Sequence, residues 1–479
     1  MGTFKAAISN QKTVTTNGMA ARVTTGSGNV DLFYKIGASR GQNILPLFQT
    51  AFLENPDYAL RIALWSRDIR EGAGERQIFR DILQWLEVNE PLHLLSIIHL
   101  IPELGRWDDG LVFKTDDFKN VYFEMIHVAL DSGNGLCAKW MPREKSSDSK
   151  IAFELRTYLD LTPKAYRKLL VSLTKVVETQ MCSKDWDNIN FSHVPSVASA
   201  RYMKAFGRNT TKYAEYIKSL VKGDDPKVKV NAGAIFPHDV IRGLFYGMDD
   251  AGPFSKEQAA FIEKQWEALP NYVGDTNVLA LVDSSGSMTS SVGGVPGLSC
   301  LQVAVSLGLY VADKNQGKFK DVFVTFASDP KIQNLSGNIV QKVNQIATSH
   351  WESSTNLEAA FKAILKLAVD NNVPEEEMPS ILLILSDMQF DRCISNPEAS
   401  ANKMIKDQYK KAGYEMPRVV FWNLNSNDNV PVKHNKEGVA LVSGFSPSVL
   451  KAILAGREDK FTPESVMLDT IMKDRYNPL

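Results

Sequence analysis

The chain has few cysteines and no recognisable export signal. Its four cysteines, Cys137, Cys182, Cys300 and Cys393, are scattered, and no two of them form a C-x-x-C pair. Scattered cysteines are typical of reduced thiols, because a disulfide framework or a thiolate zinc site usually shows closer pairing. The amino terminus also has no apolar segment of the kind that a secretory signal requires. We therefore expect a cytoplasmic protein.

Long apolar runs and an excess of charge of one sign are also missing. The longest apolar runs, near 94–101 and 381–385, are much shorter than the roughly 20 residues that span a bilayer, so we expect no membrane partner. The formal net charge of −1 excludes a globally basic nucleic-acid coat protein but allows local basic patches. A length of 479 residues leaves room for two or three domains.

The first part of the chain is predicted to be helical. Residues 1–28 are rich in Thr, Asn, Gly and Ser and are predicted to form a flexible N-terminal arm. Residues 29–270 then place apolar side chains at three- and four-residue spacing, with short connections that contain Pro or Gly. This pattern favours stacked antiparallel helices, as in a HEAT-like α-helical repeat domain. The clearest helical segments are 44–54, 57–70, 76–88 and 91–104.

The second part alternates between strand and helix patterns. Within residues 271–456, short apolar runs are separated by amphipathic segments, which predicts a doubly wound, parallel α/β sheet of Rossmann-like type. Residues 457–479 are predicted to form a C-terminal helix that packs back on the body. The fold class is therefore an α-helical domain followed by an α/β domain.

One stretch of the α/β part indicates a ligand site. The apolar run from Val278 to Val282 ends in Asp283, and Ser285 and Ser287 follow at alternate positions around Gly286. A short apolar run of this kind predicts a buried parallel strand, and ligands bind outside the carboxyl ends of such strands. One carboxylate and two hydroxyls are the oxygen ligands that Mg²⁺ and similar hard cations prefer.

Two later features strengthen the prediction of a metal site. The apolar run 380–386 is followed by Asp387, which places a second carboxylate at a strand end. Thr355 lies just before a strongly helical segment that begins near Leu357. Three separate loops, each at the end of a strand or the start of a helix, therefore offer oxygen ligands to Mg²⁺ or another divalent cation.

This arrangement of D-x-S-x-S, a Thr and an Asp resembles the metal-ion-dependent adhesion site (MIDAS) of von Willebrand factor A (vWA) domains. The resemblance implies that Ser285 and Ser287 bind the metal directly and that Thr355 binds it directly or through water. It implies that Asp283 and Asp387 act mostly through water. The alternative is a degenerate vWA domain that keeps the loop but binds no metal.

A basic segment lies in the helical part. Between Lys139 and Lys229 there are 18 Lys and Arg residues against 10 Asp and Glu, with aromatic residues such as Trp140, Tyr166 and Trp186 among them. Basic residues beside aromatic rings suit an RNA backbone and unpaired bases. In the alternative interpretation the charges cover solvated helix faces while the aromatic rings lie in the core.

A helical repeat domain followed by a vWA domain resembles the Ro autoantigen family of RNA-binding proteins, whose TROVE module precedes a vWA domain. The chain also resembles a TROVE-like plus vWA family from plants and phages. The segments that carry this resemblance include ALRIALWSRDIREGAGERQIFRDILQWL, LGRWDD, TPKAYRKLL and GAIFPHDVI. It implies a ring that binds small structured RNA or single-stranded 3′ ends. The ring would be closed by the vWA domain packing against the first helices.

The Ro-like resemblance also implies which basic residues line an RNA path. These are Arg67, Arg70, Arg76, Lys139, Arg143, Lys145, Arg156, Lys164, Arg167, Lys168, Arg201, Lys204 and Arg208.

One other function remains open, and a third is not expected. The chain could be a protein–protein scaffold without RNA binding, in which the metal accepts a carboxylate from a partner such as an ATPase or another complex. An enzyme is not expected, since the sequence has no G-x-x-x-x-G-K-[ST] phosphate loop. A haloacid-dehalogenase phosphatase would need a second Asp at the position of Ser285.

Overall fold

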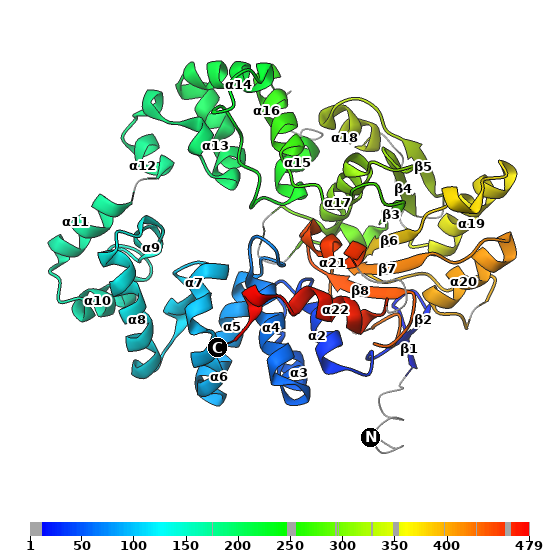
Figure 1. The fold of residues 1–479 in the computed structure, drawn as a ribbon, viewed down its shortest axis with the longest axis horizontal. Helices are drawn as coiled ribbons and strands as arrows, with labels where there is room; N and C mark the ends of the chain where they lie inside the picture. The colour runs from blue at the N-terminus through cyan, green and yellow to red at the C-terminus, as the bar shows by residue number, and fades with distance from the viewer. Residues whose placement is uncertain are drawn as a thin grey trace.

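The protein consists of an arc of helices and an α/β domain, seen side by side in the computed structural model (Figure 1). The structure describes residues 12–174, 176–246, 255–292, 295, 297–326, 329–347, 354–396, 398–427, 429–455 and 461–478. Among these residues, none of the helices combines the length and the apolar character needed to cross a bilayer.

The arc runs from α2 (Gly28–Ile36) to α16 (Lys256–Glu267). Between them lie α3 (Leu45–Glu54), α4 (Pro56–Arg67), α5 (Arg76–Asn89), α6 (Pro91–Ile97), α7 (Ile101–Leu104), α8 (Asp116–Asp131), α9 (Gly135–Trp140), α10 (Ser149–Tyr158), α11 (Pro163–Leu173), α12 (Val177–Cys182), α13 (Ser196–Asn209), α14 (Lys212–Lys222) and α15 (Pro237–Tyr246). An all-helical first part is thus confirmed, whereas its HEAT-like character stays a prediction.

Local sequence explains where these helices begin and end. The side chain of Asn55 accepts a hydrogen bond from the Tyr58 amide and caps α4, with Pro56 at the first helical position. The predicted helix 91–104 is divided into α6, a short 3-10 turn and α7. Pro102 lies at this division, and it has no amide hydrogen with which to continue the hydrogen-bond ladder of a longer helix.

The α/β domain contains a six-stranded sheet in the order β5-β4-β3-β6-β7-β8. Its strands are β3 (Val278–Asp283), β4 (Val322–Phe326), β5 (Lys331–Asn334), β6 (Ile381–Ser386), β7 (Arg418–Asn423) and β8 (Val439–Ser443). Strands β4, β3, β6, β7 and β8 are parallel. The prediction of an entirely parallel sheet was wrong at the edge strand β5, which is antiparallel to β4. Residues 327–330 join these two strands and are too few for a parallel crossover.

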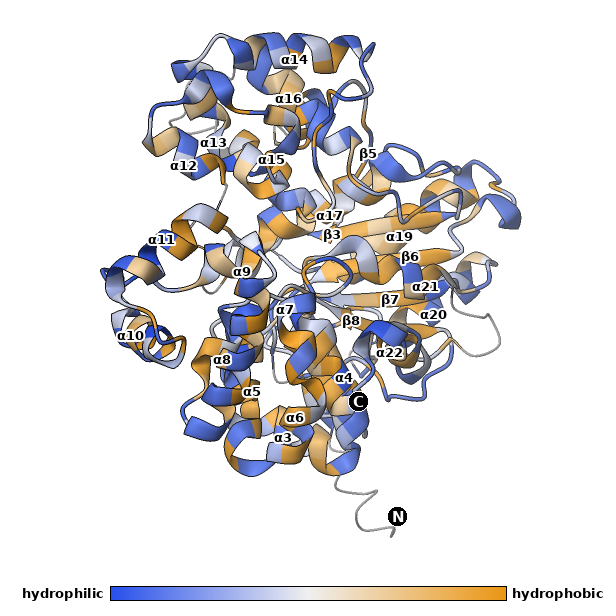
Figure 2. Ribbon diagram, turned by 60° about the vertical axis from the view of Figure 1, so that its left-hand side comes forward, coloured by the Kyte–Doolittle hydropathy of each residue, from blue (hydrophilic) through white to orange (hydrophobic). Residues whose placement is uncertain are grey.

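Helices cover both faces of this sheet. They are α17 (Cys300–Lys314), α18 (Ile339–Ala347), α19 (Leu357–Asp370), α20 (Ala401–Ala412), α21 (Leu450–Ala455) and α22 (Pro463–Ile471). Along β3, Val278, Ala280 and Val282 pack into one core, and Leu279 and Leu281 pack into the other, as side-chain alternation on a strand requires. Figure 2 shows β3, β6 and β7 mostly in the orange of apolar residues. The first of these cores continues into the helical arc, so both parts of the chain share it.

The α/β domain contacts both ends of the arc. Helix α2 packs against β8, while α15 and α16 pack against α17 and α18. The α/β domain therefore closes the arc of helices, and it packs against the first helices as the resemblance implied.

The described part of the predicted N-terminal arm, residues 12–28, includes a hairpin that lies on the α/β domain. Strand β1 (Lys12–Val14) pairs with β2 (Ala20–Arg22) in an antiparallel hairpin. The hairpin is fixed to the α/β domain because Arg22 and Val430 exchange backbone hydrogen bonds of 2.9 and 2.8 Å. The hydroxyl of Thr15 donates to the Phe390 carbonyl, so the polar residues of this segment serve as hydrogen-bond partners. Residues 1–11 lie outside the described residues.

Within the predicted C-terminal helix region, α22 packs against β8, α2 and α4. The chain then reaches Tyr476, whose hydroxyl donates to Asp68 at 2.8 Å, and Arg475 forms an ion pair with the same carboxylate. Residues 457–460 and 479 of this region lie outside the described residues.

Candidate metal centre and basic surface

Two buried carboxylates lie at the same edge of the sheet. Asp283 is the last residue of β3, and Asp387 follows the last residue of β6. These strands are parallel neighbours, with Val282 opposite Leu385, so their carboxyl ends meet. Both Asp side chains are buried, at 0% and 2% exposure. The topology therefore brings together two acids that are distant in sequence.

Two serine hydroxyls lie beside these acids. The amide of Ser285 donates to Asp283 Oδ1 at 2.9 Å, and the hydroxyl oxygens of Ser285 and Ser287 are 3.1 Å apart. The side chain of Ser287 lies near Asp387: burial raises the pKa of this carboxylate, and Ser287 opposes the rise with a smaller lowering effect. Four of the five predicted metal-site residues thus belong to one cluster. The hydroxyl of Ser386 also donates to Asp283 Oδ2.

Thr355, the fifth residue, is held next to the loop that follows β6. Its hydroxyl accepts a hydrogen bond of 3.4 Å from Asn17 Nδ2, which also donates to the Gln389 carbonyl at 2.6 Å. The amide of Gln389 donates to Asp387 Oδ1, so Asn17 and Gln389 connect Thr355 to the acid cluster. The amide of Thr355 donates to Asp391 Oδ2. In the described part of the chain, Thr355 has no direct hydrogen bond to the other four predicted residues.

Sequence reasoning missed Asn17, Gln389 and Asp391. Asn17 lies in the N-terminal hairpin, 338 positions away from Thr355. No local pattern could have assigned it to this site, because its role depends on the tertiary position of the hairpin. Asp391, in contrast, lies just beyond a predicted site residue and could have been considered.

The electrostatics of the cluster favour a cation. Burial, together with the nearby carboxylate of Asp387, raises the pKa of Asp283 to about 7. Burial also raises the pKa of Asp387. Among the described residues, no Lys, Arg or His side chain hydrogen-bonds either carboxylate. Two buried acids without a cationic partner are stabilised in their charged forms by a positive ion.

The donor set is made of oxygen atoms only. Carboxylates and hydroxyls fit Mg²⁺ or Ca²⁺, whereas zinc sites usually include Cys or His. The described residues contain no cluster of three or more His, Cys, Asp or Glu side chains able to hold a metal ion. A cation at this edge of the sheet would therefore depend on the serine and threonine hydroxyls.

The backbone beside Asp387 has an uncommon conformation. Met388 has a φ of 64°, in the left-handed region, which costs a residue with a side chain roughly 1–3 kcal/mol. Its amide donates to the Ser386 hydroxyl, which itself donates to Asp283. This turn therefore connects the backbone after one acid to the side chain of the other.

The sequence also contains one G-x-S-x-G segment, from Gly37 to Gly41, that could suggest a catalytic serine. It follows helix α2 rather than a strand, unlike the nucleophile elbow of α/β-hydrolases. The hydroxyl of Ser39 donates to the Lys35 carbonyl at 2.8 Å, and Ser39 is buried. This serine therefore caps the end of a helix.

Arg67, one of the residues predicted to line an RNA path, is buried. Arg67 is only 2% exposed, and its guanidinium forms an ion pair of 2.7 Å with the fully buried Asp109. The sequence shows the charge of Arg67 but not its partner 42 positions later.

Three other residues predicted to line the RNA path have intramolecular partners or are half-buried. Arg156 forms an ion pair of 2.9 Å with Glu144, and Arg143 donates to the Ala138 carbonyl. Lys139 is half-buried. The remaining predicted residues are exposed: Arg70, Arg76, Lys145, Lys164, Arg167, Lys168, Arg201, Lys204 and Arg208.

Four aromatic rings of the basic segment lie in the core, whereas Phe153 and Tyr158 are exposed. Phe191, Phe206 and Tyr213 pack against one another with ring centroids 5.1 to 5.5 Å apart, and Tyr166 is 1% exposed. For these rings the alternative interpretation is confirmed, and they are not available to stack on unpaired bases.

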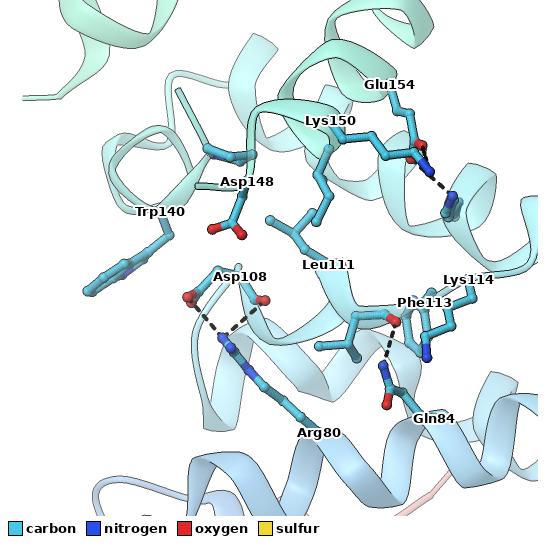
Figure 3. A pocket seen from close by; sticks show the side chains of 14 residues that line it. Arg80, Gln84, Asp108, Leu111, Phe113, Lys114, Trp140, Asp148, Lys150 and Glu154 are labelled. Carbon is cyan, nitrogen blue, oxygen red and sulfur yellow. Dashed lines mark hydrogen bonds and ion pairs between the residues drawn. The ribbon is translucent and has the colours of Figure 1, made fainter. Parts of the chain in front are cut away.

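Trp140 differs from these rings because it is half-buried and lines a cavity of about 650 Å³ (Figure 3). The Arg106 guanidinium lies 3.3 Å from the Trp140 ring centroid. Most charges around this cavity are paired, as in the Arg80–Asp108 bridge drawn in Figure 3.

The fold and the cluster together define a protein with a closed helical arc and an α/β domain that carries an acid and hydroxyl site. Residues 15–105 and 133–279 match the family described as "Domain of unknown function (DUF2828)". Residues 277–476 match the "Domain of unknown function (DUF7788)".

The chain is 31% identical to "Uncharacterized protein L728" of Acanthamoeba polyphaga mimivirus, over 97% of this chain and 88% of that protein. It belongs to the same protein family as this viral relative. Among solved structures, the Deinococcus radiodurans RO (RSR) protein is similar with a TM-score of 0.40 and 15% identity, over 93% of each chain.

Proposed function

We propose that this protein is a binding protein that holds a divalent cation at a MIDAS-type site in a vWA domain. Mg²⁺ is the cation that the donor set suits best, and its ligands come from Asp283, Ser285, Ser287, Thr355 and Asp387. The observation that carries the proposal is the cluster of two buried carboxylates and two hydroxyls, which has no cationic hydrogen-bond partner among the described residues. We propose no catalytic role for this site and a cytoplasmic location for the protein.

When bound, the cation supplies a coordination position that accepts a carboxylate from a protein partner. The chain's own residues orient this site. Ser386 holds the carboxylate of Asp283, and Asn17 and Asp391 hold Thr355 from its two sides. Because the acids are buried, water competes poorly with the cation for them.

The proposal is tested by titrating the full chain with Mn²⁺. Electron paramagnetic resonance measures the bound Mn²⁺, and Mg²⁺ is then added as a competitor. Ser287→Ala should weaken Mn²⁺ binding by about tenfold or more, as the loss of a ligand or its close support does in metal sites. Thr289→Ala is the matched control, since it removes a hydroxyl from the same loop, and among the described residues this hydroxyl donates to the Gly286 carbonyl alone. Equal Mn²⁺ binding by the wild type and Ser287→Ala would refute the site.

Partner binding is tested separately by capture with and without EDTA, using the wild type and Asp283→Ala. If EDTA and Asp283→Ala both abolish capture of the same partner, this supports a partner carboxylate bound through the metal. Capture that is insensitive to EDTA and to the substitution contradicts this role.

RNA binding along the helical arc is a second candidate function. It is favoured by Arg201, Lys204 and Arg208, which recur at spacings of three and four residues and are all exposed on α13. Lys164, Arg167 and Lys168 are exposed on α11. These cations suit the phosphates of small structured RNA or of single-stranded 3′ ends. In this function, backbone electrostatics replaces the base stacking that the buried aromatic rings do not offer.

A further inference from the structure

A second cavity, of about 440 Å³, lies where the first helices of the arc meet the α/β domain. Its walls come from the loop after α2, the connection between α4 and α5, the first turn of α5 and two residues from farther along the chain. We call it the arginine pocket, and it is lined by Arg40, Gly41, Arg67, Ile69, Gly74, Glu75, Arg76, Gln77, Ile78, Arg106 and Val295.

The arginine pocket carries more positive than negative charge. Arg40 contacts Glu75 at 2.7 Å, Arg67 contacts Asp109 at 2.7 Å, and Arg106 forms an ion pair with Asp108. Arg80, just outside the lining, shares Asp108 and Asp109. The local set is thus five guanidinium groups, from Arg40, Arg67, Arg76, Arg80 and Arg106, against three carboxylates, from Glu75, Asp108 and Asp109. Five minus three leaves an excess of two positive charges.

Arg76 takes no part in these ion pairs. Within the described residues it has no hydrogen bond and no ion pair. Partial burial and the neighbouring Arg106 and Arg80 lower the pKa of its guanidinium. The carboxylates of Asp108 and Asp109 oppose this effect from a distance. Arg76 therefore has no direct ion-pair partner among the described residues, and it is accessible to solvent.

The first turn of α5 adds to the positive environment of the arginine pocket. Glu75 stands at the N-cap position of this 14-residue helix, but its side chain makes no capping hydrogen bond because its carboxylate faces Arg40. Gln77 and Ile78 of the first turn line the cavity. The positive end of the helix dipole therefore lies at the pocket, which favours an anion.

We propose that the arginine pocket binds a phosphomonoester group, carried by a small phosphorylated molecule or by the phosphorylated end of a nucleic acid. The fork of a guanidinium matches two phosphate oxygens, and a phosphomonoester dianion balances two excess positive charges. The cavity volume lies within the range of small-molecule sites, so it can accept the group attached to the phosphate. This inference rests on neither the cation site nor the basic face of α13.

Calorimetric titration of the full chain at low salt tests the proposal. The probes are inorganic phosphate, a nucleoside 5′-monophosphate, and one short RNA with and without a 5′-phosphate. Arg76→Ala should weaken the binding of the phosphate-bearing probe by about tenfold or more, which is the effect of losing charge-assisted hydrogen bonds. Arg76→Lys keeps the charge but loses the fork, so its affinity should be intermediate.

Lys403→Ala is the control, because it removes an exposed cation outside the arginine pocket and outside the basic face of α13. It should not change the affinity for inorganic phosphate or for the monophosphate. For the RNA pair, the measured quantity is the ratio of affinities with and without the 5′-phosphate. Arg76→Ala lowers this ratio, whereas Arg201→Ala changes both affinities equally. The experiment thus distinguishes a lack of RNA binding by α13 from a lack of phosphate binding by the arginine pocket.

If the nucleoside monophosphate binds and neither RNA binds, the ligand of the pocket is a small molecule. If the RNA with a 5′-phosphate binds more tightly than the RNA without it, the ligand is the end of a nucleic acid. The proposal is overturned if none of the four probes binds the wild type. It is also overturned if Arg76→Ala, with an unchanged melting temperature in the absence of ligand, binds every probe as tightly as the wild type.

Discussion

Gly37 and Gly444 bring the first helix of the arc against the sheet with their backbones in contact. A β-carbon on Gly37 would lie 2.9 Å from the Gly444 Cα atom, closer than non-bonded carbons approach. The Gly37 amide donates to the Ser443 hydroxyl at 3.1 Å, and this hydroxyl donates to the Phe33 carbonyl at 2.8 Å. The arc is therefore joined to β8 at a place that has no room for a side chain.

Gly37→Ala should destabilise the protein because the added methyl group forces the two backbones apart. We expect a loss of about 1–3 kcal/mol in the free energy of unfolding, as for other overpacked sites, measured by urea denaturation. Gly233→Ala is the control, since a β-carbon there meets no atom within 4 Å. Equal stability of the two variants would contradict a close contact between α2 and the end of β8.

His238 should make stability depend on pH. It is 3% exposed, its Nδ1 atom has no partner among the described residues, and its ring lies edge-on to Phe445. Burial lowers its pKa to about 4; Arg40 and Arg242 add to this effect, and Asp239 opposes it.

The sign of this effect follows from proton binding. Between pH 4 and 6.5 the unfolded chain binds more protons at His238 than the folded chain, so stability is lost as pH falls through this range. The loss approaches about 3 kcal/mol near pH 4. His238→Phe should remove this part of the pH dependence in urea denaturation at pH 5 and pH 7.5. His127→Gln, where the side chain is 45% exposed, should leave this pH dependence unchanged. An unchanged pH dependence in His238→Phe would show that this ring is not buried in its neutral form.

The buried Arg67–Asp109 pair should be sensitive to the loss of either charge. Asp109→Asn leaves the guanidinium of Arg67 buried without its counter-charge, and breaking such pairs costs about 3–5 kcal/mol. The control is Asp57→Asn, which breaks the Arg61–Asp57 pair, where the aspartate is 48% exposed. Exposed pairs contribute about 1 kcal/mol or less, so the control should change the thermal midpoint little. Similar midpoints for the two variants would mean that Arg67 is reached by solvent.

RNA binding by α13 makes a prediction about salt dependence. Replacing Arg201, Lys204 and Arg208 together by Ala should reduce the slope of log affinity against log salt by about 2 for single-stranded RNA, since three phosphate contacts are lost. The matched control replaces Lys403, Lys406 and Lys410 by Ala, which have the same spacing and exposure on α20. Filter binding at several salt concentrations measures both slopes. Equal slopes for the two triple variants would exclude α13 as the RNA contact.

The acid cluster could be predicted from sequence because it depends on strands that are visible as apolar runs. The runs that end at Asp283 and Asp387 form β3 and β6, and parallel neighbours necessarily bring their carboxyl ends to one edge of the sheet.

Other features depended on contacts that no local pattern contains. Strand β5 has only four residues with alternating partial burial, so it shows no apolar run. The polar N-terminal hairpin is ordered by partners such as Phe390 and Val430, which are distant in the chain. Whether Arg67 faced solvent or Asp109 could not be decided from its charge alone.

The packing of α2 on β8 has a consequence for how the chain is made. The hydrogen bonds that join them connect residues 406 and 410 positions apart, so α2 leaves the ribosome long before its partner strand is translated. Phe33 and Tyr34 of α2 pack into the two apolar cores that flank the sheet. On a nascent chain that has not reached β8, these apolar side chains lack the surface that buries them. Premature termination before Val439 would therefore yield fragments that aggregate or engage chaperones.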